Sequence, residues 1–225
     1  MRTLFVFFLL LAIKVASRIF YRHEVVWVGD VPADRWHGLR LVALLNHTSL
    51  FELLYLGDAP LTLLWAIARR GVIPAAQKTI DRPLVGLLYR LVACQVVPIS
   101  RERDQTWSDL LGSIRSDGVV VMAPEGRMMR ETGLDATGRQ MTIRGGIADV
   151  LRALGSGGML IAYSGGLHHV QVPGRWPRIF RTVRLRLERV DIAAYVKTLG
   201  EGRDPDAFKR AVKDDLQRRR DLYCT

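Results

Sequence analysis

The sequence is poor in several residue types that would mark particular classes of protein. Its 225 residues include two cysteines, Cys94 and Cys224, which lie far apart in the chain. Two distant cysteines exclude a disulfide scaffold and a cysteine-based zinc site. Lysine is also scarce, since only five of the 33 cationic residues are lysines and the rest are arginines. No internal repeat and no long linker divides the chain, which indicates one domain of ordinary size.

Acidic residues are scarce as well. The 22 aspartates and glutamates leave a formal net charge of +11 and a sequence pI near 10.3. Hydrophobic residues make up 49% and charged residues 24%, a balance that excludes a mostly disordered chain. A basic surface implies an anionic partner, which could be nucleic acid, an acidic membrane or a phosphorylated substrate. The sequence shows no helix-turn-helix, zinc-finger or RNP pattern, so we expect no nucleic-acid partner.

The amino-terminal residues narrow the choice of partner. Residues 4–13 form an apolar run of ten, which is short for a membrane span of about 20 residues. Lys14, Arg18 and Arg22 follow at four-residue intervals and so share one helical face. A cleaved signal peptide, a buried core helix and an interfacial membrane helix all compete here. We favour the interfacial helix, with the apolar run in the lipid and the basic face on anionic head groups.

Apolar strands that alternate with helices predict an α/β fold. We expect a single domain with a mainly parallel central sheet flanked by helices, preceded by the membrane-associated amino-terminal helix. The divisions are a membrane-anchoring helix (1–24), the α/β domain itself (25–200) and a basic carboxyl-terminal helix packed on or extending it (201–225). Strands are expected at 25–29, 39–46, 95–100, 118–123, 159–164 and 182–190, the last as a half-exposed edge strand because apolar and charged residues alternate. Helices are expected at 82–91, 103–115, 143–154 and 205–222, a helix starts at 52–56, and 61–68 is a strand or a short helix.

Reactive side chains follow the first buried strand, and open α/β sheets bind ligands beyond the carboxyl ends of their strands. His47 and Glu52 are five residues apart, which on a regular helix separates them by about 140°. They meet only if His47 precedes the helix and Glu52 lies in its first turn. Ser49 favours this arrangement, because Ser49 to Glu52 has the S-x-x-E form of a capping box. Glu52 is then either only a cap or the group that orients His47, which takes a proton from a hydroxyl.

Two further segments follow later strands. Arg101 comes at the end of the strand expected at 95–100. Pro124-Glu125-Gly126-Arg127 directly follows the strongest strand. This segment is either a turn in which Glu125 pairs with Arg127, or an anion site in which glycine allows close approach and arginines bind phosphate.

Taken in order, these segments resemble the glycerolipid acyltransferase family of membranes, over about residues 25 to 165. Asn46, His47 and Glu52 are similar to its N-H-x-x-x-x-D motif, with Glu for Asp. The second motif, a strand that ends in arginine, is similar to the segment before Arg101. The third motif, P-E-G-T-R-S-R, resembles 124–127 with one residue missing before the arginine. Arg144-Gly145-Gly146 resembles the basic-glycine element that follows, and 159–163 resembles the fourth motif without its proline.

The resemblance implies transfer of a fatty acyl group from acyl-CoA or acyl-carrier protein to a lysophospholipid hydroxyl. The expected acceptor is 1-acyl-sn-glycerol-3-phosphate, and the expected place is the cytoplasmic face of the inner membrane, on an acidic lipid surface. His47 is then the general base and Glu52 its orienting carboxylate, with no covalent acyl-enzyme, no cofactor and no metal. The residues expected to hold the phosphate end of the acceptor are Arg101, Glu125, Gly126, Arg127, Arg130 and Arg144.

Two alternatives remain at this point. The longer carboxylate, the shortened third motif and the missing proline leave room for a different hydroxylated lipid as acceptor. The second alternative is a serine hydrolase, because 162–166 approximates a G-x-S-x-G nucleophile elbow around Ser164. That elbow requires a helix directly after the serine, and the residues that follow are poor helix formers.

Overall fold

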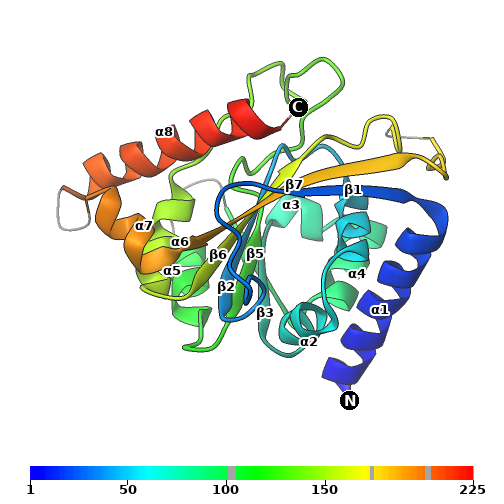
Figure 1. The fold of residues 1–225 in the computed structure, drawn as a ribbon, viewed down its shortest axis with the longest axis horizontal. Helices are drawn as coiled ribbons and strands as arrows, with labels where there is room; N and C mark the ends of the chain where they lie inside the picture. The colour runs from blue at the N-terminus through cyan, green and yellow to red at the C-terminus, as the bar shows by residue number, and fades with distance from the viewer. Residues whose placement is uncertain (101–104, 173–174, 201–203, 225) are drawn as a thin grey trace.

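The computed structural model describes residues 1–100, 105–172, 175–200 and 204–224, and shows one sheet between two layers of helices (Figure 1). The strands are β1 (Arg22–Trp27), β2 (Leu39–Leu45), β3 (Gly71–Ala76), β4 (Gln95–Ile99), β5 (Val119–Met122), β6 (Gly158–Ser164) and β7 (Thr182–Asp191). The helices are α1 (Arg2–Phe20), the 3-10 helix η1 (Leu50–Gly57), α2 (Leu61–Arg70), α3 (Gln77–Ile80), α4 (Pro83–Val92), α5 (Gln105–Ser113), α6 (Gly146–Leu154), α7 (Ile192–Thr198) and α8 (Pro205–Tyr223).

The sheet has the strand order β1-β7-β6-β2-β5-β3-β4. The five strands from β6 to β4 run parallel to one another, whereas β7 is antiparallel to β6 and β1 is parallel to β7. This confirms the predicted α/β fold with a mainly parallel sheet. The prediction of an edge strand at 182–190 is wrong, because β7 lies between β1 and β6. Its apolar residues, Val183, Leu185 and Leu187, pack in the core on one face of the sheet, and the intervening arginines point to the other face.

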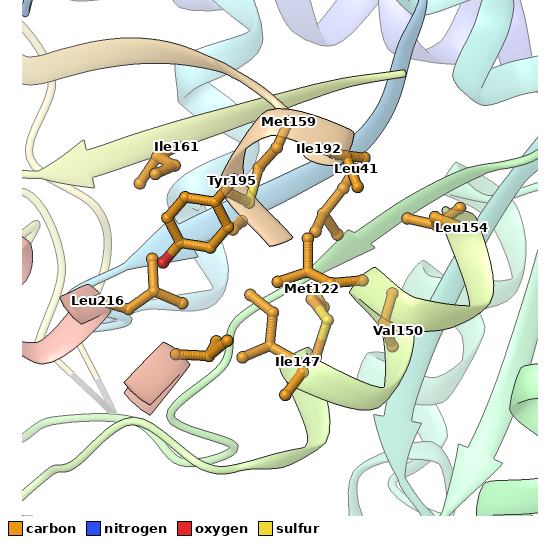
Figure 2. Packing of buried hydrophobic residues seen from close by; sticks show 14 of the residues in the cluster. Leu41, Met122, Ile147, Val150, Leu154, Met159, Ile161, Ile192, Tyr195 and Leu216 are labelled. Carbon is orange, nitrogen blue, oxygen red and sulfur yellow. The ribbon is translucent and has the colours of Figure 1, made fainter. Parts of the chain in front are cut away.

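Side chains of the central strands alternate between two hydrophobic cores. On one face, Leu41 of β2 and Met159 of β6 pack against α6, α7 and α8 (Figure 2). On the other face, Leu160 of β6 packs against residues of α1, η1, α2 and α4. The basic helix α8 joins the first core through buried residues spaced four apart, namely Phe208, Val212 and Leu216. Both faces of the sheet are thus covered, and its carboxyl edge remains for a site.

The amino-terminal helix differs from the prediction in length, and its basic face makes contacts within the protein. α1 has 19 residues and is long and apolar enough, by length and composition, to cross a membrane. Lys14 Nζ donates to the carbonyl oxygens of Gly57 (2.6 Å) and Ala59 (2.8 Å). Arg18 donates to Gly57 O (3.0 Å) and forms an ion pair with Asp58 (2.8 Å). These contacts fasten α1 to η1, while the Arg18 side chain stays 54% exposed, so the expected contact of the basic face with lipid head groups stays a prediction.

Candidate active site

The candidate site lies at the carboxyl edge of the parallel strands, where the chain leaves β2. Asn46 adopts a left-handed conformation with φ of 64°, which asparagine tolerates better than most residues. Its side-chain amide donates to Ser164 O (2.8 Å) at the end of the neighbouring β6. Ser49 is extended, and its hydroxyl accepts from Phe51 N (3.1 Å) at the start of η1. The turn between β2 and η1 is thereby fixed at both ends.

Glu52 divides its two carboxylate oxygens between two tasks. Oε2 forms a hydrogen bond with Nδ1 of His47. Oε1 accepts from the backbone amides of Thr48 (2.6 Å) and Ser49 (3.3 Å), which completes the predicted capping box. The cap and the orienting carboxylate, which the sequence offered as alternatives, are both present in one side chain.

The hydrogen bond to Glu52 also defines the state of the His47 ring. A proton on Nδ1 satisfies the carboxylate and leaves the lone pair of Nε2 to act as a base. Burial alone acts to lower the pKa of His47, but the charge and hydrogen bond of Glu52, with the charge of Glu125, outweigh it. The resulting pKa of His47 lies above the ordinary value, because the two carboxylates favour the protonated ring.

Glu125 lies behind this pair. Its carboxylate is buried, and the two oxygens accept from Asn46 N (2.9 Å) and His47 N (2.8 Å). Burial raises the pKa of Glu125 in spite of these two amides and the nearby positive charge of Arg220. The sequence suggested that Glu125 holds the phosphate end of the acceptor. In the structure its oxygens instead hold the backbone that carries His47.

The positive charge beside Glu125 comes from Arg220 on α8. Nε of Arg220 is 2.7 Å from Oε1 of Glu125, and Nη1 donates to Met141 O (2.8 Å). Sequence reasoning missed this residue, because α8 lies outside the segment that resembles the family. One signal was available: Arg220 falls four residues after Leu216 and so continues the buried stripe of α8. A charged residue in such a stripe requires a buried partner.

The remaining predicted phosphate-binding residues are not all brought together. Gly126, Arg127 and Arg144 line the same cavity as His47 and Glu52. Gly126 has a φ of 65°, which favours glycine. The guanidinium of Arg127 forms an ion pair with Asp135, whose pKa is lowered by hydrogen bonds from Thr137 and Arg139 and by Arg127. Arg130 is exposed, and Arg101 lies outside the described residues.

The cavity has a volume of about 810 Å³, within the range of small-molecule sites. Its apolar part lies between the sheet and the η1, α2 and α4 layer, where Val42, Leu44, Leu53, Leu63, Leu88 and Leu160 are among its lining residues. Its basic part includes Arg127, Arg144 and Lys209, beside Gly145 and Gly146 at the start of α6. The reactive pair thus borders a space that offers both apolar surface and cationic groups.

Ser164 does not form a nucleophile elbow. Its side chain is fully buried at the end of β6, where the hydroxyl contacts the Tyr55 hydroxyl and accepts from Gly166 N (3.0 Å). The described residues that follow it, 165–172, form turns without a helix. His168, the nearest histidine in sequence, uses Nε2 to bond Met129 O (2.9 Å). The geometry of a serine hydrolase is therefore missing at this position.

Comparison with known proteins agrees with this geometry. Residues 30–164 match the model of the family described as Acyltransferase, and this segment is more than half of the chain. The chain belongs to the acyltransferase family and is an O-acyltransferase. No curated protein matches it.

Among solved structures, the chain is similar to the crystal structure of the 1-acyl-sn-glycerophosphate (LPA) acyltransferase PlsC from Thermotoga maritima. The TM-score is 0.54 at 17% sequence identity, and the match covers 93% of this chain and 79% of that chain. At this identity the similarity shows a shared fold.

Proposed function

We propose that this acyltransferase moves a fatty acyl group from an acyl thioester, acyl-CoA or acyl-carrier protein, to the hydroxyl of a lysophospholipid. The acceptor that best fits is 1-acyl-sn-glycerol-3-phosphate. One observation carries the proposal: the His47–Glu52 pair, backed by Glu125, borders a cavity with an apolar interior and cationic side chains. A lysophospholipid and an acyl thioester both combine an acyl chain with a polar anionic end.

In the proposed reaction His47 is the general base. Nε2 takes the proton from the acceptor hydroxyl as its oxygen attacks the thioester carbonyl. A C–O bond forms and the C–S bond breaks, and the leaving thiolate receives the proton from the His47 imidazolium. Glu52 keeps the ring in the required tautomer and stabilises its positive charge. The two amides on Glu125 fix the backbone from which the ring projects, so Glu125 is a positioning residue.

Substrate binding follows from the two parts of the cavity. Arg144 carries charge that suits a phosphate. Lys209 and Arg127 line the same cavity, with their charges shared with Asp149 (3.1 Å) and Asp135. The apolar part suits an acyl chain. The uncovered apolar face of α1 and the net charge of +11 support a location on an acidic membrane surface, and soluble thioester donors support the cytoplasmic side of that membrane. The cationic side chains in the cavity favour a lysophospholipid, and a different hydroxylated lipid is the alternative acceptor.

The test is acyl transfer from radiolabelled acyl-CoA and acyl-carrier protein to a panel of lysolipids in detergent micelles. His47→Ala should lower the rate by about 10²- to 10⁴-fold, the usual contribution of a general base. His37→Ala is the matched control, because His37 is an exposed histidine in the turn before β2. The proposal fails if the wild type transfers nothing from either donor, or if His47→Ala is as active as His37→Ala.

A further inference from the structure

A surface that acyl transfer does not use lies where the carboxyl end of α1 meets residues 175–181 (Figure 1). Phe180 N donates to Phe20 O (2.7 Å), and Arg22 N donates to Arg181 O (3.1 Å). These backbone hydrogen bonds hold the two segments together. Their side chains therefore belong to one continuous surface, which we call the 175–181 corner.

Large apolar side chains are exposed at this corner. Trp176 is 92% exposed and Phe180 is 64% exposed, and Ile179 beside them is also exposed. Phe180 has a φ of 57°, a conformation that bulky residues rarely adopt, and its ring contacts that of Phe20 with centroids 6.3 Å apart. Soluble surfaces seldom group large apolar residues in this way, and such a group marks a binding surface.

The charge around these side chains is of one sign. Arg175, Arg178 and Arg181 alternate with them along the chain, and all three are exposed. The sequence contains no aspartate or glutamate from 165 to 187. Exposed tryptophan and phenylalanine among arginines match the interface of an anionic bilayer, where rings enter the head-group region and guanidinium groups bind phosphates.

The corner also continues the outward face of α1. That face is largely apolar, with Leu4, Phe8, Val15 and Ile19 exposed at helical spacing and the half-exposed Arg18 beside Val15. The opposite face of α1 packs on η1, α2 and α4, so α1 lies along the domain with its apolar stripe uncovered.

We infer that residues 175–181 form a second membrane-contact segment, in which Trp176, Ile179 and Phe180 enter an anionic bilayer beside α1. This inference deepens the membrane association in the proposed function. The chain that leads to the segment contacts the catalytic turn, since Leu167 N donates to Thr48 Oγ1 (2.9 Å) and Ser49 Oγ donates to Gln171 (3.3 Å). Lipid contact at the corner would therefore orient the candidate site relative to the membrane surface.

The experiment measures flotation of the full chain with vesicles of phosphatidylcholine alone and of phosphatidylcholine with phosphatidylglycerol. We expect Trp176→Ser to bind both kinds of vesicle about ten-fold more weakly, because one large ring no longer enters the interface. The triple variant R175Q/R178Q/R181Q should bind anionic vesicles about ten-fold or more less tightly than the wild type, with no change on neutral vesicles. This difference from the wild type should become smaller as the salt concentration rises. The charge-matched control, R115Q/R210Q/R218Q, removes three exposed arginines elsewhere on the protein. Its affinity for anionic vesicles should be within about two-fold of the wild-type affinity.

A second measurement locates the ring directly. Brominated phosphatidylcholine should quench part of the tryptophan fluorescence of the wild type, and Trp176→Ser should lose most of that quenching. Because these assays contain neither acyl donor nor acceptor, their outcome is independent of whether the proposed reaction occurs. Unchanged vesicle binding and unchanged quenching in Trp176→Ser would overturn the inference. So would a fall in oligomer mass in that variant at unchanged vesicle binding, which would assign the corner to a second copy of the chain.

Discussion

Removal of the Arg220 guanidinium should damage catalysis although Arg220 touches no substrate in the proposed mechanism. The Glu125 side chain is fully buried and that of Arg220 is 12% exposed, so solvent screens their ion pair little. Loss of one partner of a buried pair typically costs about 3–5 kcal/mol. Glu125 can reduce this cost by taking up a proton, because burial already raises its pKa. A protonated carboxyl accepts well at one oxygen only, and one of the two amides that it holds then loses its acceptor.

The magnitude follows from that lost hydrogen bond. A buried polar group left without a partner costs about 1–3 kcal/mol. If the lost hydrogen bond weakens the stabilisation of the transition state by this free energy, kcat/KM falls by about ten- to hundred-fold in Arg220→Met. KM should change less than kcat, because the substrate-binding groups stay in place. Arg220→Lys keeps the charge and should recover part of the loss. Arg218→Met, two residues away and 74% exposed in its side chain, is the matched control and should change kcat/KM by less than about two-fold.

Steady-state acyl transfer, thermal unfolding and a pH series together test this reasoning. Arg220→Met should regain activity relative to the wild type as pH rises, because its Glu125 ionises at higher pH. The double variant R220M/E125Q should lose less than the sum of the two single losses, since no unpaired charge remains. The coupling between Arg220 and Glu125 would be refuted if the two single losses of activity added exactly in the double variant. A wild-type kcat/KM in Arg220→Met would refute it as well.

Two more predictions concern His47 and the packing of η1. The rate of acyl transfer should rise with pH as His47 loses its proton, with a midpoint above the ordinary histidine pKa of 6.5. Glu52→Gln should move that midpoint to lower pH and reduce the rate on the plateau. An unmoved midpoint in the pH–rate profile of this variant would contradict the pairing of His47 with Glu52. Gly57→Ala should destabilise the fold by about 1–3 kcal/mol, because the new methyl group would lie 2.3 Å from the His23 ring. In Gly112→Ala the new methyl group has no neighbour within 4 Å inside α5, so this variant should be more stable by about 0.5–1 kcal/mol. Thermal unfolding of the two variants distinguishes these opposite signs.

The features that could be predicted from the sequence are those that depend on local patterns of residues. The apolar strands, the capping box from Ser49 to Glu52 and the meeting of His47 with Glu52 follow from spacing and residue type, and the structure contains them. The sequence did not predict β3, because Pro74 interrupts the strand pattern. Pro74 is tolerated since β3 pairs with β5 only at Gly71 and Val72 and pairs with β4 alone beyond them.

Other features depend on contacts between distant parts of the chain. Apolar and charged residues alternate in the same way along an edge strand and along an inner strand with one polar face. Only the pairing of β7 with β1 and β6 shows that it is an inner strand. The contacts of Lys14 and Arg18 could not be predicted, because their partners, the carbonyls at the end of η1 and Asp58, lie some forty residues away. Arg220 and Glu125 are separated by most of the carboxyl-terminal half. Local periodicity places Arg220 on the buried stripe of α8, but it does not identify the partner in any of these pairings.

The placement of Arg220 on α8 sets the order in which the enzyme is completed during synthesis. α1 precedes the turn with His47 and the strand before Glu125 along the chain, so it emerges from the ribosome before them. The guanidinium that neutralises Glu125 is translated long after both, although domains begin to fold while the chain is still growing. The apolar stripe of α1 is therefore complete before the Glu125–Arg220 pair can hold the turn that carries His47. A fragment cut to the boundaries of the family match, 30–164, would lack α1, β1, β7 and α8 together, and with α8 the cation that pairs with Glu125.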